Sequence, residues 1–343
     1  GCVAASLGAE LRALRVPTVA VIADRGFADA GLLESLLGAA PDPRLAVCAL
    51  ISEDPDLAEA ERAAAAALEL GAGAVLAVGG GSALCAAKAA AIRLSNPPPL
   101  TAYAGSDRLD RPPVPVIAVP TTAGSGSEVS NVVVLHEPGR ARHLVIRGRG
   151  YEPRVALLDG DLLASLPPGP LIAAALDALS HALEALWVAT ASSFTDALAQ
   201  AAAATIADAL PRALEGDRDE AQALIEASAS ANLACGNAGL GLVHALSSAA
   251  SVRLPHGRQN GVLLPHVAAF NGPMLRPAVA RTVELLGGLY EPIGFGARFA
   301  DGELDAGDAD AMVAAALANP FRELNCRPAG EPELRAILRA AGA

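Results

Sequence analysis

Five short apolar runs mark the first 160 residues, with helix-like stretches between the first four, and this alternation most constrains the fold. The runs are rich in Val, Ala and Ile and are bounded by turn residues, as buried β-strands are. They read PTVAVIAD, RLAVCALI, AGAVLAVG, PVIAVP and VALLD. Strands separated by helices favour a mostly parallel sheet, because parallel neighbours need a crossover connection. We therefore expect an α/β domain of the Rossmann-like type.

The strand pattern stops after Asp159 and the turn SLPPGP, and helix patterns dominate from there to the end of the chain. A chain of 343 residues is long enough for two domains with substantial cores. We predict a nucleotide-binding α/β domain over residues 1–162 and an all-helical, metal-binding domain over residues 163–343.

A glycine run joins the third apolar stretch to an alanine-rich helix in VLAVGGGSALCAAKAAA. Glycines at a strand-to-helix turn let the backbone approach a pyrophosphate, and the free N–H groups at the helix start bind its charge. The candidate residues are Gly79, Gly80, Gly81 and Ser82. A glycine run can equally serve a tight turn alone, because glycine readily adopts positive φ.

The fourth apolar run leads into a second candidate nucleotide loop, PTTAGSGSE. Thr121, Thr122 and Ser125 offer hydroxyl groups there on a backbone loosened by glycine. The alternative interpretation is a plain Ser/Gly connection.

Asp24 ends the first apolar run, where a carboxylate would hydrogen-bond an adenosine ribose and repel a 2′-phosphate. This favours NAD(H). Two alternatives remain open, because Arg25 would suit the extra phosphate of NADP(H) and because Asp24 is also a good helix N-cap.

One aspartate and three histidines in the second half have the pattern of a metal site. Asp177 and His181 lie four residues apart in a helix-like stretch, so both leave the same face one turn apart. His244 closes another apolar helix-like run, and His256 lies in a Pro-His-Gly turn. One carboxylate with three imidazoles suits Fe²⁺ or Zn²⁺, with a position left for substrate. Alternatively, each histidine is an ordinary packed or exposed side chain.

Four separated motifs, together spanning roughly residues 17–270, resemble the signatures of the iron-containing (group III) alcohol dehydrogenase family. They read GGGSALCAAK, PTTAGSGSE, DALSHALEAL and HALSSAASVRLPHGRQNGVLLPHV. The resemblance implies the dehydroquinate synthase-like fold of that family and a catalytic divalent metal. Carried over by position, the implied metal ligands are Asp177, His181, His244 and His256. The implied dinucleotide contacts are Gly79, Gly80, Gly81, Ser82, Thr121, Thr122 and Ser125.

Three departures from the family pattern concern the cofactor and the proton pathway. Cys85 stands where the family usually has aspartate, and Ser248 stands where many members have a histidine assigned to proton relay. The stretch from His244 to His256 is two residues shorter than usual. None of these changes removes an implied metal ligand. A serine hydroxyl is a poor base but an adequate relay.

The resemblance implies a metal-dependent, NAD(P)H-linked alcohol dehydrogenase that acts as an aldehyde reductase on a small substrate. The pattern from HALS to Arg253 looks most like the phosphonoacetaldehyde reductases, which make 2-hydroxyethylphosphonate, and Arg253 would hold the anion. Alternatively, Arg253 is a surface charge, and the substrate is a simple primary alcohol or a maleylacetate-type dicarboxylate. Two other classes stay open: a non-redox, dehydroquinate-synthase-like lyase, and a catalytically silent homologue acting as a binding subunit.

Net charge, apolar run length and cysteine usage limit the partners and the cellular compartment of the protein. A net charge of −12 argues against nucleic acid and against an anionic membrane surface. No apolar run reaches transmembrane length. The five cysteines are scattered and form no CxxC pair, so we expect free thiols and a cytoplasmic protein. The family resemblance implies a homodimer.

Overall fold

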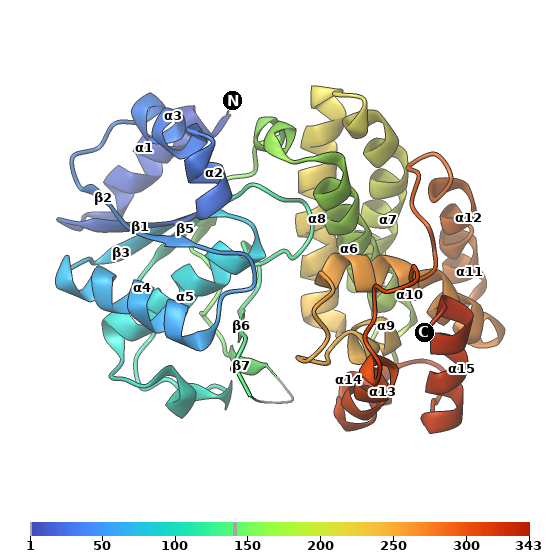
Figure 1. The fold of residues 1–343 in the computed structure, drawn as a ribbon. Helices are drawn as coiled ribbons and strands as arrows, with labels where there is room; N and C mark the ends of the chain where they lie inside the picture. The colour runs from blue at the N-terminus through green and yellow to red at the C-terminus, as the bar shows by residue number, and fades with distance from the viewer. Residues whose placement is uncertain (1, 140–142) are drawn as a thin grey trace. The chain divides into compact units, whose positions relative to one another are not determined.

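The computed structural model describes residues 2–139 and 143–343, which form two compact units (Figure 1). The first unit contains the chain up to Thr122 and again Ser127–Ser165. The second contains Leu166–Ala343 together with the short segment Ala123–Gly126. The loop after the fourth apolar run is therefore shared between the two units.

A five-stranded parallel sheet forms the centre of the first unit, with strand order β2-β1-β3-β5-β8. The central strands are buried throughout, which explains why their sequences are continuously apolar and do not alternate. The predicted α/β fold with a mostly parallel sheet is confirmed. The strands are β1 (Val19–Asp24), β2 (Leu45–Ile51), β3 (Ala74–Gly79), β5 (Val116–Pro120) and β8 (Val155–Ala156).

Helices cover both faces of this sheet (Figure 1). On one face, leucines of α1 and α3 pack against β1 and β3. On the other face, alanines of α4 and α5 pack against the same two strands, and their small side chains let these helices approach closely. The helices are α1 (Cys2–Leu14), α2 (Arg25–Asp29), α3 (Leu32–Ala39), α4 (Leu57–Glu69) and α5 (Gly81–Ser95).

A second, three-stranded sheet in the first unit was not predicted from the sequence. Its strand order is β4-β7-β6, and β6 and β7 pair antiparallel. These strands have at most four residues, too few for a clear period-two pattern to stand out. They are β4 (Gly105–Ser106), β6 (Val132–Leu135) and β7 (Leu144–Arg147), and 3₁₀ turns occupy η1 (Leu100–Tyr103) and η2 (Gly160–Ser165).

The second unit is helical in its described residues, as predicted, and three long helices pack together at its centre. They are α6 (Pro168–Trp187), α7 (Ser193–Leu214) and α8 (Arg218–Ala238). The remaining elements are α9 (Leu242–Leu246), α10 (His256–Asn271), η3 (Gly272–Met274), α11 (Pro277–Val283), α12 (Leu285–Leu289), α13 (Asp308–Ala318), α14 (Phe321–Leu324) and α15 (Glu331–Ala341). Among all helices of the described residues, none has the length and apolarity to span a bilayer.

Candidate active site

The two sequence-predicted nucleotide loops meet at the carboxyl edge of the parallel sheet. Gly79 ends β3 and is the register partner of Pro120, which ends β5. The backbone N–H of Thr121 donates to the carbonyl of Gly79 at 3.1 Å. In parallel α/β sheets, ligands bind outside the carboxyl ends of the strands. The first unit thus presents both loops on the edge where a nucleotide is expected.

The turn from β3 into α5 requires its glycines. Gly79 has φ +144°, and a Cβ there would lie 2.7 Å from the Cβ of Asp24. A Cβ on Gly80 would lie 3.1 Å from Cγ2 of Thr122, so the two loops touch at this point. Gly80 is the N-cap of the 15-residue helix α5 and makes no side-chain cap. The helix start therefore keeps N–H donors and a positive dipole end for an anionic ligand.

Asp24 and Ser82 both have structural partners. The Asp24 carboxylate caps α2 by accepting from the backbone N–H of Phe27 at 2.8 Å. The Ser82 hydroxyl accepts from the backbone N–H of Asp54 at 3.1 Å. Asp24 therefore acts as a helix N-cap through one carboxylate oxygen. A contact between its second oxygen and the adenosine ribose remains a proposal.

The middle of the second loop folds with the helical unit. A Cβ on Gly124 would lie 2.8 Å from the carbonyl oxygen of Ala174, so the loop backbone runs directly over α6. Gly126 has φ +58° in the left-handed region, and its missing side chain leaves room for Asn232. Asn232 is buried and donates to the Gly124 carbonyl at 3.0 Å. Ser125 lies in this segment, which belongs to the helical unit.

Three of the four candidate metal ligands form a tight group. The ligand atoms of Asp177, His244 and His256 all lie within 4.8 Å of one another. Asp177 Oδ1 is 3.7 Å from His244 Nε2 and 3.9 Å from His256 Nε2. His181 Nε2 lies 4.0 Å from the same oxygen but falls outside the group. Asp177, His181 and His244 are buried, while the His256 side chain is half exposed.

The Pro-His-Gly sequence places His256 beside α6. His256 is the first residue of α10, and the next position packs against the backbone of α6. A Cβ on Gly257 would lie 2.4 Å from the carbonyl oxygen of Ala173. Ala173 precedes Asp177 by about one helical turn. Only glycine permits this approach, which holds the His256 imidazole over the Asp177 carboxylate.

We expect Gly257→Ala to displace the start of α10 from α6, because the new methyl group overlaps the Ala173 carbonyl. Overpacking of this kind costs about 1–3 kcal/mol, and the shift should also weaken metal binding through His256. Urea unfolding and metal analysis check this. Gly236→Ala is the matched control, since Gly236 lies inside α8 with open space around its missing Cβ and should tolerate alanine. Equal behaviour of the two variants would contradict the packing role.

Glu184, which the sequence analysis missed, supports His244. Its side chain is fully buried on the face of α6 that carries Asp177 and His181, three residues beyond His181. Its Oε2 lies 2.6 Å from His244 Nδ1, and its Oε1 accepts from the backbone N–H of Val243 at 2.7 Å. A carboxylate on one imidazole nitrogen fixes the tautomer and frees the other nitrogen for a metal. The sequence did contain one signal for this residue: Glu184 follows His181 by three residues in a predicted helix, so the two side chains share a face.

Asn260 was also missed. It is fully buried on α10, one turn after His256. Its amide nitrogen lies 2.7 Å from Asp177 Oδ1, 3.0 Å from His256 Nε2 and 3.2 Å from His244 Nε2. The Asn260 side-chain amide thus lies within hydrogen-bonding distance of all three ligand atoms. The three ligand atoms are therefore aimed at one small region.

Electrostatics in this group favour a cation. Burial would raise the pKa of Asp177, but the neighbouring imidazoles outweigh it and lower the pKa well below its usual range. Burial lowers the pKa of His181, so that its imidazole is neutral at neutral pH. Burial also acts to lower the pKa of His244, but the carboxylates of Asp177 and Glu184 prevail and raise it. Two buried carboxylates thus attract positive charge to His244.

The residues present fit a divalent metal ion. Nitrogen and carboxylate oxygen donors suit iron or zinc, and the neutral form of histidine is the one that binds metal. Within the described residues, His181 Nδ1 and Asn260 Oδ1 are buried without a hydrogen-bond partner. A bound cation would also balance the buried charge of Asp177.

Two sequence-predicted residues, Ser248 and Arg253, and a further histidine, His266, follow His244 along the chain. The Ser248 hydroxyl is half-buried and donates to the Ala245 carbonyl at 2.7 Å. Arg253 is exposed in the stretch between α9 and α10. His266, a further histidine of α10, has its Nε2 2.7 Å from the carbonyl oxygen of Ala297. His266 is thus used to hold another segment.

Known proteins resemble the chain over nearly its whole length. The models of iron-containing alcohol dehydrogenase and of the Fe-containing alcohol dehydrogenase family, C-terminal, match residues 2–160 and 171–342. The probable alcohol dehydrogenase EutG of Salmonella typhimurium is 34% identical over 281 residues, which are 76% of this chain and 70% of that protein.

Solved structures give the same result. A 1,3-propanediol oxidoreductase superposes with a TM-score of 0.91 at 28% identity, covering 98% of this chain and 95% of that chain. The sulfoacetaldehyde reductase from Bifidobacterium kashiwanohense, in complex with NAD⁺, gives a TM-score of 0.88 at 26% identity, covering 99% and 95%.

Proposed function

Because the chain belongs to the iron-containing alcohol dehydrogenase family, and so is an oxidoreductase acting on CH–OH groups, we propose that it interconverts small aldehydes and alcohols with NAD(H). In this proposal Asp177, His181, His244 and His256 hold an iron ion. The observation that carries the proposal is the convergence of the buried Asp177 carboxylate and His244 imidazole with the half-exposed His256 imidazole, from α6, α9 and α10.

A divalent metal held there supplies a Lewis acid that polarises the carbonyl oxygen of the substrate and stabilises the negative charge developing on it. The protein contributes by holding its ligands in place. Asp177 and His181 are fixed by the long helix α6, and His244 by its bond to Glu184. Ligands on rigid helices keep their geometry without reorganisation during the reaction.

The nicotinamide dinucleotide is proposed to bind at the carboxyl edge of the parallel sheet. Its pyrophosphate would accept hydrogen bonds from the backbone at Gly80, Gly81 and Ser82, at the start of α5. Thr121 and Thr122 border the same turn, and Asp24 lies against Gly79. We assign NAD(H) over NADP(H), because a 2′-phosphate near the Asp24 carboxylate would be repelled.

Reduction of an aldehyde also needs a proton for the product oxygen. We propose that the Ser248 hydroxyl passes this proton between product and solvent. It donates to the Ala245 carbonyl at 2.7 Å, which leaves its oxygen lone pairs available to accept a proton from water.

A small anionic aldehyde is the proposed substrate, with phosphonoacetaldehyde as the specific candidate. The exposed guanidinium of Arg253, nine residues after His244, would bind the anion. The likeness to a sulfoacetaldehyde reductase supports an anionic substrate, since a sulfonate and a phosphonate present similar oxygens.

Metal analysis combined with an NADH-consumption assay on an aldehyde panel tests this function. The panel contains phosphonoacetaldehyde, sulfoacetaldehyde, propanal and butanal, each assayed with iron-loaded and zinc-loaded protein. We expect about one divalent ion per chain, turnover with NADH and the highest kcat/KM on the anionic members. Metal binding with no NADH turnover on any aldehyde would favour the lyase alternative. Absence of both metal binding and turnover would indicate a silent homologue.

Arg253→Ala should lower kcat/KM on phosphonoacetaldehyde by roughly ten- to a hundredfold, because a charge-assisted bidentate contact contributes about 1.5–3 kcal/mol. Steady-state kinetics on propanal provide the control, since a neutral aldehyde has no anion to lose and should be nearly unaffected. Equal losses on both substrates would mean that Arg253 supports the loop before His256 and does not bind substrate.

A further inference from the structure

Lys88 is a buried cation with no part in the chemistry proposed so far. It is the only lysine among the 343 residues, and its side chain is 2% exposed. Burial of an ammonium group is unfavourable unless its protons are donated. Lys88 Nζ donates to the carbonyl oxygens of Ser127 at 3.0 Å, Ser130 at 3.1 Å and Val132 at 2.6 Å. All three protons of the ammonium group are therefore used.

The three carbonyls belong to the end of the second nucleotide loop. Ser127 is the residue at which the chain returns to the first unit, and Val132 is the first residue of β6. Lys88 itself lies on α5, the helix that begins at the glycine turn. One side chain thus joins the helix of the first nucleotide loop to the exit of the second.

Cys85 reinforces this contact from the same face of α5. Its Sγ lies 3.5 Å from the Ser127 hydroxyl, and Cys85 precedes Lys88 by three residues, about one helical turn. Both side chains therefore dock the stretch from Ser127 to Val132 onto α5.

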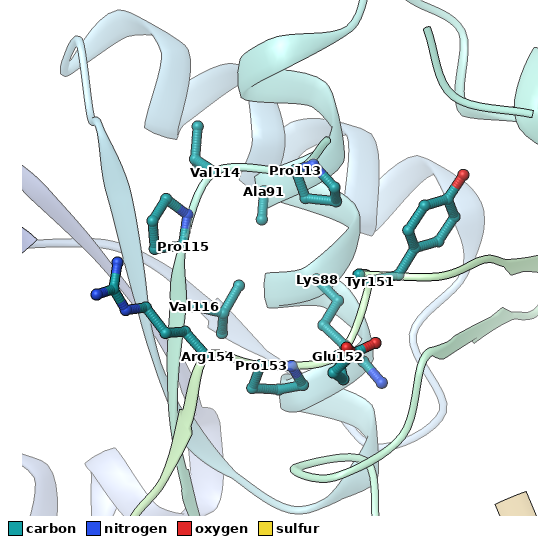
Figure 2. A pocket seen from close by; sticks show the side chains of 11 residues that line it. Lys88, Ala91, Pro113, Val114, Pro115, Val116, Tyr151, Glu152, Pro153 and Arg154 are labelled. Carbon is teal, nitrogen blue, oxygen red and sulfur yellow. The ribbon is translucent and has the colours of Figure 1, made fainter. Parts of the chain in front are cut away.

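The surroundings explain why the cation is a lysine in a chain whose other basic residues are arginines. Three carbonyls around one point match the three protons of a compact ammonium, whereas the planar fork of a guanidinium spreads its donors. Burial lowers the pKa of Lys88, and Glu128 and Glu152 oppose this effect. Lys88 also lines a pocket of about 400 Å³. Figure 2 shows its side chain there with those of Tyr151 and Glu152.

We propose that Lys88 is the positioning residue of the dinucleotide site, setting the place of the loop around Ser127 relative to the glycine turn so that NAD(H) can bind. This inference rests on the proposed function. Lys88 itself does not touch the cofactor in this proposal. It acts through the backbone of the second loop.

Lys88→Met tests the proposal, because methionine keeps a similar length but donates no hydrogen bond. We expect the Kd for NADH, measured by calorimetry, to rise about tenfold or more, since three carbonyls lose their donor and the loop relaxes. Metal content should be unchanged, and kcat at saturating NADH should stay within about twofold, so that the defect lies in the KM for NADH. An unchanged Kd in the folded variant would overturn the proposal.

Arg93→Met is the matched control. Arg93 is a second buried cation on α5, but it bonds Glu61 and the Asn96 carbonyl, and not the nucleotide loops. Its loss should lower the melting temperature and leave the Kd for NADH unchanged. A rise in Kd equal to that of Lys88→Met would show that general loosening of α5 suffices, and would overturn the positioning role.

Two further measurements keep the test decisive. In Lys88→Ala, n-propylammonium replaces the missing side-chain atoms and should restore NADH affinity, while tetramethylammonium, which has no N–H, should not. In the wild-type protein, NADH should slow acylation of Lys88 by an amine-reactive ester several-fold, with the α-amino group as internal control. Failure of both effects would overturn the inference. A wild-type protein that binds no NADH would instead refute the proposed function.

Discussion

Asp177→Asn should abolish stable metal binding and reduce kcat/KM by about a thousandfold or more. Asparagine preserves the shape of the side chain but removes the only negative charge among the four candidate ligands. Lewis-acid stabilisation of a developing oxyanion is worth several kcal/mol, and each 1.36 kcal/mol corresponds to a factor of ten in rate. Metal analysis after dialysis and kinetics with added iron measure the two effects.

The control for Asp177→Asn is Asp208→Asn. Asp208 is exposed on α7, where it pairs with Arg212 one turn along the helix, and exposed pairs of this kind contribute little. We expect metal content and activity to remain at wild-type levels. Full metal content in Asp177→Asn would refute the proposed ligand set.

Glu184→Gln should lower metal affinity by about ten- to a hundredfold, the usual effect of losing a partner of a metal-bound histidine. Glutamine can still accept from the backbone N–H of Val243, so the fold should persist. The carboxylate accepts from His244 Nδ1–H, whereas the NH₂ group of glutamine would donate to Nδ1. The proton of the neutral imidazole would then reside on Nε2, the nitrogen that must bind the metal. Competition with a chelator of known affinity measures the change.

Glu184→Ala separates this tautomer effect from simple loss of packing. It removes the fully buried carboxylate and leaves two donors unpaired, and breaking such a buried pair costs about 3–5 kcal/mol of folding stability. Glu226→Gln on α8 provides the control, because this exposed side chain accepts from Gln222 one helical turn away. If Glu184→Gln bound metal like the wild type, the orienting role of Glu184 would be wrong.

Local patterns in the sequence were sufficient for much of the fold. The apolar runs that become β1, β2, β3 and β5 were located within about two residues, because buried parallel strands are continuously apolar. The run VALLD was too long, since only Val155 and Ala156 pair with β5. The small β4-β7-β6 sheet was missed because four-residue strands carry too little pattern.

Helical spacing predicted that Asp177 and His181 share a face, because the geometry of an α-helix is fixed by neighbours in sequence. The same spacing extends to Glu184, but its role depends on His244, which lies 60 residues further along the chain. Asn260 and Asn232 gave no sequence signal of their own. Each acquires its role only when α10 or α8 packs against a distant segment.

The sequence by itself determined the family, the parallel sheet, the helical second half and the residue types that suit a metal. Each of these follows from short-range periodicity or from motifs read in order along the chain. Only the tertiary structure decided that Gly257 brings His256 over α6, that Glu184 orients His244, and that Lys88 joins the two nucleotide loops. These contacts depend on close packing between distant segments. In such packing a single Cβ can prevent the approach of two helices, and a buried polar group is stable only if its hydrogen bond is made.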